Sequence, residues 1–165
     1  MRTSTLLLLG LFVSTALHAT VVVDMFSTKP DHQKIGDIIF KNKKNGLMIF
    51  PDLKGLPPGE HGFHLHEYAS CDNAGMAAGG HYDPLQLKKH LGPYHQGHQG
   101  DLPKLFVDKN GIAHHPSFAP HLAEKNICGH AVMIHAGGDN YSDEPKPLGG
   151  GGERIACGFV KSSVN

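Results

Sequence analysis

The stretch HGFHLHE, residues 61–67, places three histidines in seven positions and ends on a carboxylate. Side chains alternate between the two faces of a β-strand, so a strand here would turn His64 and His66 to one face and Phe63 and Leu65 toward a core. Two imidazoles on one pleated face can reach a single metal ion. Two solvent-exposed histidines explain this stretch equally well when it is taken alone.

The sequence on either side of this stretch predicts further short strands separated by turns. The expected strands are VVVDMFS (21–27), GDIIF (36–40), LMIF (47–50), the hairpin LFVDKNGIA (105–113), HAVMIH (130–135) and RIACGFV (154–160). Two long stretches, about residues 68–104 and 137–153, resemble no strand, and long loops of this kind are often functional. The pattern predicts one all-β domain, a sandwich or barrel with large loops over one face.

The N-terminal residues have the features of a secretory signal peptide. A short basic start precedes an apolar run at 6–13, and small residues follow it. We expect cleavage after Ala19, or alternatively after Ala16, which would leave residues 20–165 as the mature domain. The apolar run is too short to remain as a membrane anchor.

Composition narrows the classes of function. Without residues 1–19 the chain keeps 14 of its 15 basic residues and all 15 acidic residues, a formal charge of −1. This balance gives no indication of nucleic-acid or membrane-surface binding. Fourteen histidines in a small exported protein favour metal binding. Three cysteines in an oxidising compartment predict one disulfide and one remaining thiol.

The possible metal ligands are spread over several short motifs. They are His64 and His66 in HGFHLHE, His81 in GGHYDP, His90 in KKHLG, His98 and Asp101 in HQGD, and His135 with Asp139 in MIHAGGD. Zinc takes about four nitrogen, sulfur or oxygen ligands in a tetrahedron, whereas a tetragonal all-nitrogen set suits copper. Six histidines and one aspartate would fill both kinds of site if one imidazole served both ions.

The motifs in this order resemble the copper,zinc superoxide dismutases of the bacterial exported type, over nearly all of the mature chain. The matching pieces are GFHLHE, GGHYDP, HxxD before DLPxLFV, GHAVMIHAGGDNYSD and LGGGGxRIACG. The resemblance implies an eight-stranded antiparallel Greek-key barrel of the immunoglobulin-like sandwich class. It also implies a periplasmic enzyme, commonly a homodimer, that disproportionates superoxide to dioxygen and hydrogen peroxide and protects against superoxide outside the cytoplasm.

The resemblance assigns roles to individual residues. Copper would be held by His64, His66, His81 and His135, and zinc by His81, His90, His98 and Asp101, with His81 as the bridging imidazolate. Arg154 would bind the anionic substrate, because a guanidinium stays charged and hydrogen-bonds anions well. Asp139 would accept hydrogen bonds from one copper histidine and one zinc histidine, which fixes their tautomers.

The same resemblance pairs Cys71 with Cys157 in a disulfide, which the chain-entropy model values at about 4.6 kcal/mol. Cys128 would remain as a buried or half-buried thiol.

The loop from Cys71 to Gly80 departs from the pattern of the family. Bacterial relatives often carry lysines in this loop, and this chain has no basic residue there. Lys146, with Asp143 and Glu144, would shape the field over the entrance.

Rival metal proteins fit the residues less well. A binuclear zinc hydrolase with the pattern HxHxDH would need an aspartate and a histidine where Tyr68 and Ala69 stand. An α-type carbonic anhydrase is a much larger chain and needs no second metal site. A periplasmic copper or zinc store would explain the histidines, but it would give Arg154 no role.

Seven further histidines remain after the six proposed ligands and His18 are set aside. They are His32, His61, His95, His114, His115, His121 and His130. We expect them to be solvated surface residues. The alternative is a second binding activity, an extra transition-metal ion or a haem, at His95 beside Tyr94 or at the pair His114–His115.

Overall fold

The computed structural model describes residues 20–160, so the expected signal peptide at 1–19 lies outside the described residues. The strands within this range are β1 (Thr20–Ser27), β2 (Lys34–Lys43), β3 (Gly46–Lys54), β4 (Gly59–His61), β5 (Phe63–His66), β6 (Leu105–Val107), β7 (Ile112–Ala113), β8 (Ser117–Pro120), β9 (Ala131–His135) and β10 (Arg154–Phe159). Three single-turn 3-10 helices accompany them: η1 (Met76–Ala78), η2 (Glu124–Asn126) and η3 (Leu148–Gly150). None of the helices among these residues is long and apolar enough to cross a membrane.

The strands form a barrel because a small sheet links the two ends of a large one. The large sheet runs β5-β9-β10-β1-β2-β3-β7, with β8 also on β3, while β4 pairs with β6. Only Gly62 separates β4 from β5, and the turn Asp108–Gly111 joins β6 to β7. With β4–β5 and β7–β8 each taken as one interrupted strand, the eight strands of the expected antiparallel barrel are present. The predicted fold class is confirmed.

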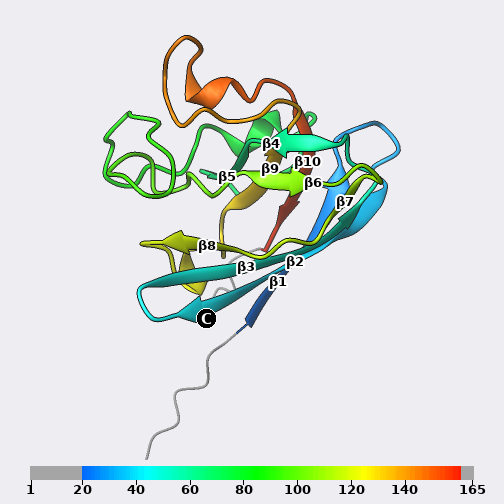
Figure 1. Cartoon of the computed structure of the whole chain (residues 1–165), viewed down its shortest axis with the longest axis horizontal. Helices are drawn as coiled ribbons and strands as arrows, with labels where there is room; N and C mark the ends of the chain where they lie inside the picture. Colours follow the sequence, from blue (N-terminus) through cyan, green and yellow to red (C-terminus); the bar gives the residue numbers. More distant parts are fainter. Residues whose placement is uncertain (1–19, 161–165) are drawn as a thin grey trace, which may run out of the picture.

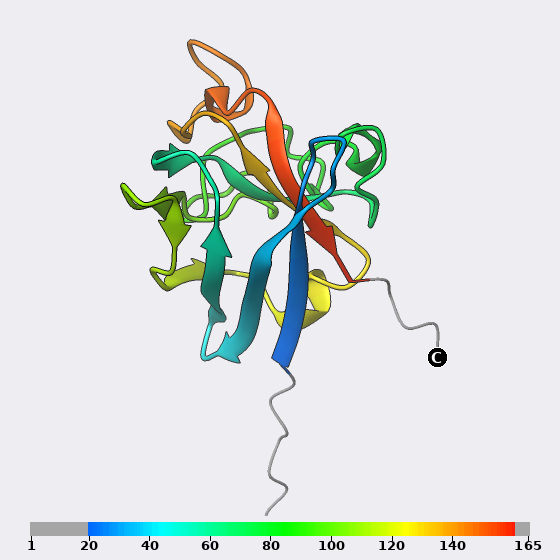
Figure 2. The same ribbon diagram turned by 90° about the vertical axis from the view of Figure 1, so that its right-hand side faces the viewer.

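The figures show how these strands enclose the core. β1–β3 form one side of the barrel, and β4 with β6 lies on the opposite side (Figure 1). The turned view places β10 beside β1, its antiparallel partner (Figure 2). β9 lies between β5 and β10 in the large sheet, although β5 is more than 60 residues away in the sequence. Strands that are distant in sequence are therefore neighbours beneath the long loops.

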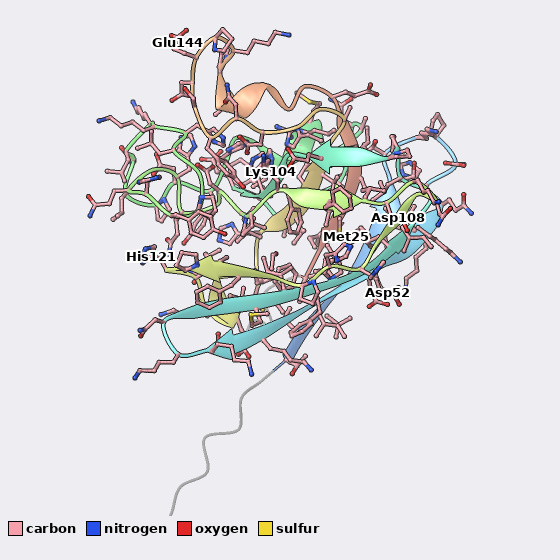
Figure 3. All side chains as sticks on the ribbon, viewed as in Figure 1. Met25, Asp52, Lys104, Asp108, His121 and Glu144 are labelled. Atoms are coloured by element: carbon pink, nitrogen blue, oxygen red, sulfur yellow. A yellow bond between two sulfur atoms is a disulfide. The ribbon has the colours of Figure 1, made fainter. Side chains whose placement is uncertain are left out.

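Alternating side chains explain why the strands bury one face. In β1, Val23 and Met25 are fully buried while Val22 is half exposed. Met25 lies in the barrel interior, as Figure 3 shows. Residues from β2, β3, β5, β9 and β10 complete the same core. Burial of each large aliphatic or aromatic side chain contributes roughly 1.5–3 kcal/mol to folding.

The expected strands all form, but β8 was not predicted. Its sequence SFAP ends on Pro120, which lacks a backbone N–H and so weakens any strand signal. Pro120 is tolerated in this strand because β8 pairs with β3 outside the main strand order. Tertiary pairing with β3, rather than local propensity, therefore decides this strand.

Two long loops cover one end of the barrel, as the sequence predicts. The segments 68–104 and 137–153 contain no named strand, only η1 and η3 respectively. A disulfide joins Cys71 in the first loop to Cys157 in β10, with 5.8 Å between their Cα atoms, and so confirms the expected pairing. Cys128 is a half-buried free thiol. Glu144 lies at the outer tip of the second loop (Figure 3).

Candidate metal centre

The HGFHLHE stretch forms the floor of the candidate metal centre. Phe63 and Leu65 point into the main hydrophobic core, whereas His64 and His66 face the long loops. His64 is 0% exposed and His66 is 1% exposed, because the loops cover this face of β5. The alternation predicted from the sequence is therefore confirmed, and the reading as two solvated histidines is wrong.

One group of ligand atoms combines β5 with β9 and the first loop. The side chains of His64, His66, His81 and His135 place one ligand atom each within 4.8 Å of one another. β5 and β9 are antiparallel neighbours, which sets the end of β9 beside the start of β5. His81 joins them through a bridge between its backbone and that of His66.

The ring nitrogens of this group are oriented for a metal ion. His66 Nδ1 donates to the Gly79 carbonyl at 3.0 Å, and His135 Nδ1 donates to the Gly152 carbonyl at 3.0 Å. His64 Nε2 donates to Asp139 Oδ2 at 2.8 Å. The opposite nitrogens, His64 Nδ1, His66 Nε2 and His135 Nε2, are buried and have no hydrogen-bond partner among residues 20–160. Since a buried polar atom without a partner is costly, a bound metal ion fits these three lone pairs.

A second group lies on the other side of His81. His64, His81, His90 and Asp101 also bring ligand atoms within 4.8 Å of one another. Asp101 Oδ1 is 3.1 Å from His81 Nδ1 and 3.0 Å from His90 Nδ1. The group contains His64 because the His64 ring stacks on His81 with 3.9 Å between centroids. His64 Nε2 is already bonded to Asp139, so His64 has one free nitrogen for one ion.

His98 lies beside the second group but is not one of the residues whose ligand atoms all lie within 4.8 Å of one another. Its Nδ1 is 3.5 Å from Asp101 Oδ1, beyond the contacts that Asp101 makes with His81 and His90. This atom is buried and has no hydrogen-bond partner among the described residues. The donor set of His81, His90, His98 and Asp101 has the nitrogen and oxygen composition of a tetrahedral zinc site. On chemical grounds His98 fits such a site better than His64 does.

Asp139 connects the two groups by accepting a hydrogen bond from one histidine of each, His64 and His90. Its Oδ2 accepts from His64 Nε2 at 2.8 Å, and its Oδ1 accepts from His90 Nε2 at 2.7 Å. The backbone N–H of Tyr141 donates to the same Oδ1 at 2.7 Å. These are the contacts expected from the sequence, and they fix which nitrogen of each histidine faces the centre.

Burial determines the charge of the first group in the metal-free protein. Burial lowers the pKa of His64 to about 3, that of His66 to about 2 and that of His135 to about 4, and the neighbouring His81 adds to each effect. The pKa of His81 is also lowered by burial. These imidazoles are therefore neutral near pH 7, the form that binds a metal ion.

The second group behaves differently because carboxylates surround it. Burial alone would lower the pKa of His90, but hydrogen bonds with Asp101 and Asp139 raise that pKa to about 9. Burial alone would raise the pKa of Asp101, yet hydrogen bonds from His81 and His90, with His98 close by, hold that pKa far below its usual range. In the metal-free protein a proton on His90 provides positive charge between the two carboxylates, and a cation at the second group would replace it.

Arg154 stands at the opening above the first group. It pairs with His135 across β10 and β9, and it lines a cavity of about 460 Å³ together with His66, His81 and His135. Its Nη1 donates to the Gly75 carbonyl at 2.5 Å and its Nη2 to the Gly79 carbonyl at 2.7 Å. Among the described residues that line this cavity, Arg154 is the one with a permanent positive charge. Lys146 and Glu144 are exposed on the second loop, and Asp143 accepts from the His90 backbone N–H.

Two of the surplus histidines depart from the expected surface role. His61 is 2% exposed, with its ring nitrogens 2.7 Å from the carbonyl oxygens of His135 and Pro57. His130 Nδ1 lies 2.9 Å from the Glu67 carbonyl and 3.2 Å from the His66 carbonyl. Sequence reasoning missed both, since no local pattern distinguishes these histidines from solvated ones.

The other surplus histidines agree with the surface expectation. His32, His95, His114, His115 and His121 are exposed. His114 and His115 stack with 4.6 Å between ring centroids, and neither belongs to a metal-ligand group of three or more among residues 20–160. An extra metal or haem site at His95 or at His114–His115 stays a prediction.

Comparisons with known proteins agree with this geometry. The family model described as copper/zinc superoxide dismutase matches residues 34–160. The chain is 49% identical to "Superoxide dismutase [Cu-Zn]" of Legionella pneumophila, over 98% of this chain and 100% of the relative.

Solved structures of similar proteins share the fold. Copper/zinc superoxide dismutase from Brucella abortus superposes with a TM-score of 0.81 at 41% identity, covering 87% of this chain and 100% of that chain. The monomeric enzyme from Salmonella enterica gives a TM-score of 0.74 at 48% identity, with the same coverage. These matches confirm the resemblance found in the sequence and give copper and zinc as the metals of the family. With its barrel, its two histidine groups and these relatives, the chain belongs to the copper/zinc superoxide dismutase family of oxidoreductases.

Proposed function

We propose that this protein disproportionates superoxide to dioxygen and hydrogen peroxide at two metal ions that share one histidine. Copper would be held by His64, His66, His81 and His135, and zinc by His81, His90, His98 and Asp101. The observation that carries the proposal is the position of His81, which belongs to both ligand groups and directs its Nδ1 toward Asp101. An imidazole that loses both protons can bind two ions at once, so His81 would act as a bridging imidazolate.

Bound copper would supply a one-electron couple that takes an electron from one superoxide and returns it to another, while zinc has no accessible second oxidation state. Arg154 would hold the anion beside His66 and His135, because its guanidinium lies in their cavity and is aimed by its bonds to Gly75 and Gly79. Focusing of anions by a positive cleft speeds association, and superoxide dismutases are a known example.

His81 would also take part in proton transfer. Hydrogen peroxide formation consumes two protons for each pair of superoxide anions, and His81 lines the same cavity as Arg154. Nδ1 of the same ring is held on the side of Asp101. When Nε2 is not engaged by an ion, His81 would take a proton from solvent at Nε2 and pass it to the reduced anion while Nδ1 keeps the ring in place, and solvent would supply the second proton directly.

The place of action proposed for this enzyme is the periplasm, after removal of residues 1–19, where it would protect against superoxide outside the cytoplasm. The disulfide between Cys71 and Cys157 supports export, because such bonds persist in oxidising compartments. The substrate is a small anion, and no nucleic acid or membrane anchor is part of the proposal.

We also propose a homodimer, with Tyr94 as an apolar contact. Tyr94 is 57% exposed on the first loop, and a large exposed aromatic side chain is common at subunit interfaces. The Salmonella enterica relative is described as monomeric, so sedimentation at several protein concentrations should decide the oligomeric state of this chain. A sedimentation coefficient of one chain at all concentrations would contradict the dimer.

Reconstitution tests the function itself. The metal-free protein should bind one copper and one zinc, and only the loaded protein should remove superoxide with catalytic turnover. The alternative function is a metal store, which would bind the same ions and remove superoxide no faster than the metal-free protein does. A loaded protein without turnover would exclude the enzyme and favour the store.

A further inference from the structure

The copper opening contains a methionine that the proposed catalytic roles do not use. Met76 lines the cavity of about 460 Å³ that also exposes His66, His81, His135 and Arg154. Its side chain is 59% exposed, although a methionine normally gains stability by burial. The 3-10 turn η1 begins at Met76 and thus places a thioether at the rim of the metal centre.

The turn that carries Met76 is held firmly in place. Arg154 donates to the carbonyl groups of Gly75 and Gly79, which flank η1 on both sides. Gly75 has a φ of 81°, and a Cβ there would meet Met133 at 3.0 Å, so the backbone packs closely against the barrel. Ala78 is fully buried beside Met133. The backbone of η1 is therefore fixed, while the exposed side chain of Met76 keeps three rotatable bonds.

The ligands at this opening suit monovalent copper. A thioether is a soft ligand that selects Cu(I), and imidazole nitrogen also binds copper. His66 Nε2 and His135 Nε2 are buried, lack hydrogen-bond partners among residues 20–160, and belong to the ligand group in the same cavity as Met76. One sulfur and two nitrogens would provide a three-ligand set before the ion reaches the full histidine group.

Charge does not select between the two copper ions at this opening, because the cavity is lined by one guanidinium, that of Arg154, and one carboxylate, that of Glu153. The soft thioether is therefore the feature that favours Cu(I). Met76 adds no charge of its own, so it can bind the ion without disturbing the positive site that attracts the substrate.

The second opening that reaches His81 has a different character. A cavity of about 500 Å³ is lined by His81, His98 and the carboxylates of Glu67, Asp83 and Asp143. Asp83 Oδ1 is buried without a hydrogen-bond partner among the described residues. Carboxylates favour harder divalent ions over Cu(I). The soft ligand is thus confined to the opening on the side of the proposed copper group.

We propose that Met76 is an entry ligand for Cu(I), which binds there together with His66 and His135 and then passes to the complete histidine group. The inference rests on the proposed copper site. The transfer exchanges one ligand for another with copper remaining Cu(I), so no electron is gained or lost.

The test compares Met76→Leu with the unaltered protein in metal-free form under anaerobic conditions. Cu(I) is supplied as its bicinchoninate complex, and uptake is followed by loss of the absorbance of the complex. We expect Met76→Leu to take up Cu(I) about ten-fold more slowly, a factor that corresponds to about 1.4 kcal/mol. Uptake of Cu(II) and Zn(II) should be unchanged. Met48→Leu, on β3 away from the cavity, is the matched control and should load as the unaltered protein does.

A second measurement detects the bond between Cu(I) and the Met76 sulfur directly and does not depend on the rate of copper uptake. In a His64→Ala variant, which lacks one final ligand, Cu(I) should remain near the opening. X-ray absorption should then detect sulfur scattering that disappears in His64→Ala/Met76→Leu. Equal Cu(I) uptake rates with no sulfur signal would overturn the role of Met76 and leave the copper site intact. Failure of the unaltered protein to retain any copper would overturn the proposed function as well.

Discussion

His61 and His135 are joined by a hydrogen bond in which the ring Nδ1 of His61 lies 2.7 Å from the backbone carbonyl oxygen of His135. The contact ties the end of β4 to the end of β9, the strand that presents a proposed copper ligand. The other ring nitrogen of His61 reaches the Pro57 carbonyl at 2.7 Å. The ring thus supports the metal centre from the barrel side, and binding of a metal ion by either nitrogen of His61 would displace the carbonyl that this nitrogen contacts.

We expect His61→Leu to lower the free energy of unfolding by roughly 1–3 kcal/mol, because the His135 carbonyl would lose its buried partner. Copper affinity should fall too, since the backbone that positions His135 would be less constrained. Urea unfolding and a copper competition titration measure the two effects. The matched control is His114→Leu at an exposed position, and an equal effect of both variants would exclude a specific role for His61.

The shared ligand His81 should be indispensable. We expect His81→Ala to abolish nearly all dismutation and to reduce both copper and zinc content, because each group loses one ligand. Metal analysis, the electron paramagnetic resonance spectrum of Cu(II) and a superoxide assay provide the measurements. A copper spectrum and activity like those of the unaltered protein would rule out the bridge.

Substitution of Arg154 should separate substrate attraction from metal binding. We expect Arg154→Ala to lower kcat/KM for superoxide by about ten-fold or more at low salt, within the range of electrostatic steering. Arg154→Lys keeps the charge but cannot reproduce both bonds to Gly75 and Gly79, so it should retain part of the rate. Copper and zinc content should stay unchanged. Loss of metal in Arg154→Ala would instead indicate a structural role.

The metal-free protein should lose stability as the pH falls from about 6.5 to about 4. The folded-state pKa values of His64, His66 and His135, about 3, 2 and 4, lie below the ordinary value of 6.5. In that window the unfolded chain binds protons that the folded protein excludes, so each histidine reduces stability by up to about 1.4 kcal/mol per pH unit. Denaturant unfolding at several pH values measures the slope.

His90 has the opposite linkage, which gives the experiment an internal check. Its folded-state pKa of about 9 lies above 6.5, so its stabilising contribution is complete below pH 6.5 and is lost as the pH rises through about 9. We therefore expect maximal stability of the metal-free protein near pH 6.5, where the two ranges meet. A stability that increases steadily toward pH 4 would contradict the assignment of neutral buried histidines.

Loss of the disulfide should destabilise the first loop and the whole domain. We expect Cys71→Ser/Cys157→Ser to reduce the free energy of unfolding by up to about 4.6 kcal/mol, the chain-entropy value for a separation of 86 residues. Cys128→Ser is the control, because Cys128 is a free thiol. Equal unfolding midpoints for the double variant and the unaltered protein would show that the loop is held by other contacts.

Much of the fold follows from local sequence patterns. The alternation in VVVDMFS predicts which side chains of β1 are buried, because a strand turns successive residues to opposite faces. The same rule places His64 and His66 on one face of β5. The motifs HQGD and MIHAGGD keep possible ligands close together along the chain, so their proximity needs no tertiary information. In these cases the structural feature depends on residues that are close together in the chain, so it can be predicted from the sequence.

Other features depend on contacts between distant segments, and no local pattern reveals them. β8 forms because β3 offers it an edge, and His61 is buried because β4 crosses close to the end of β9. The nitrogen of His64 that remains free is selected by Asp139, which lies 75 residues further along the chain. Arg154 fixes the turn of Met76 through the carbonyls of Gly75 and Gly79. The sequence by itself determined the strands and the ligand types, whereas packing in three dimensions decided which atoms face the metals, because hydrogen-bond partners from distant segments orient each ring.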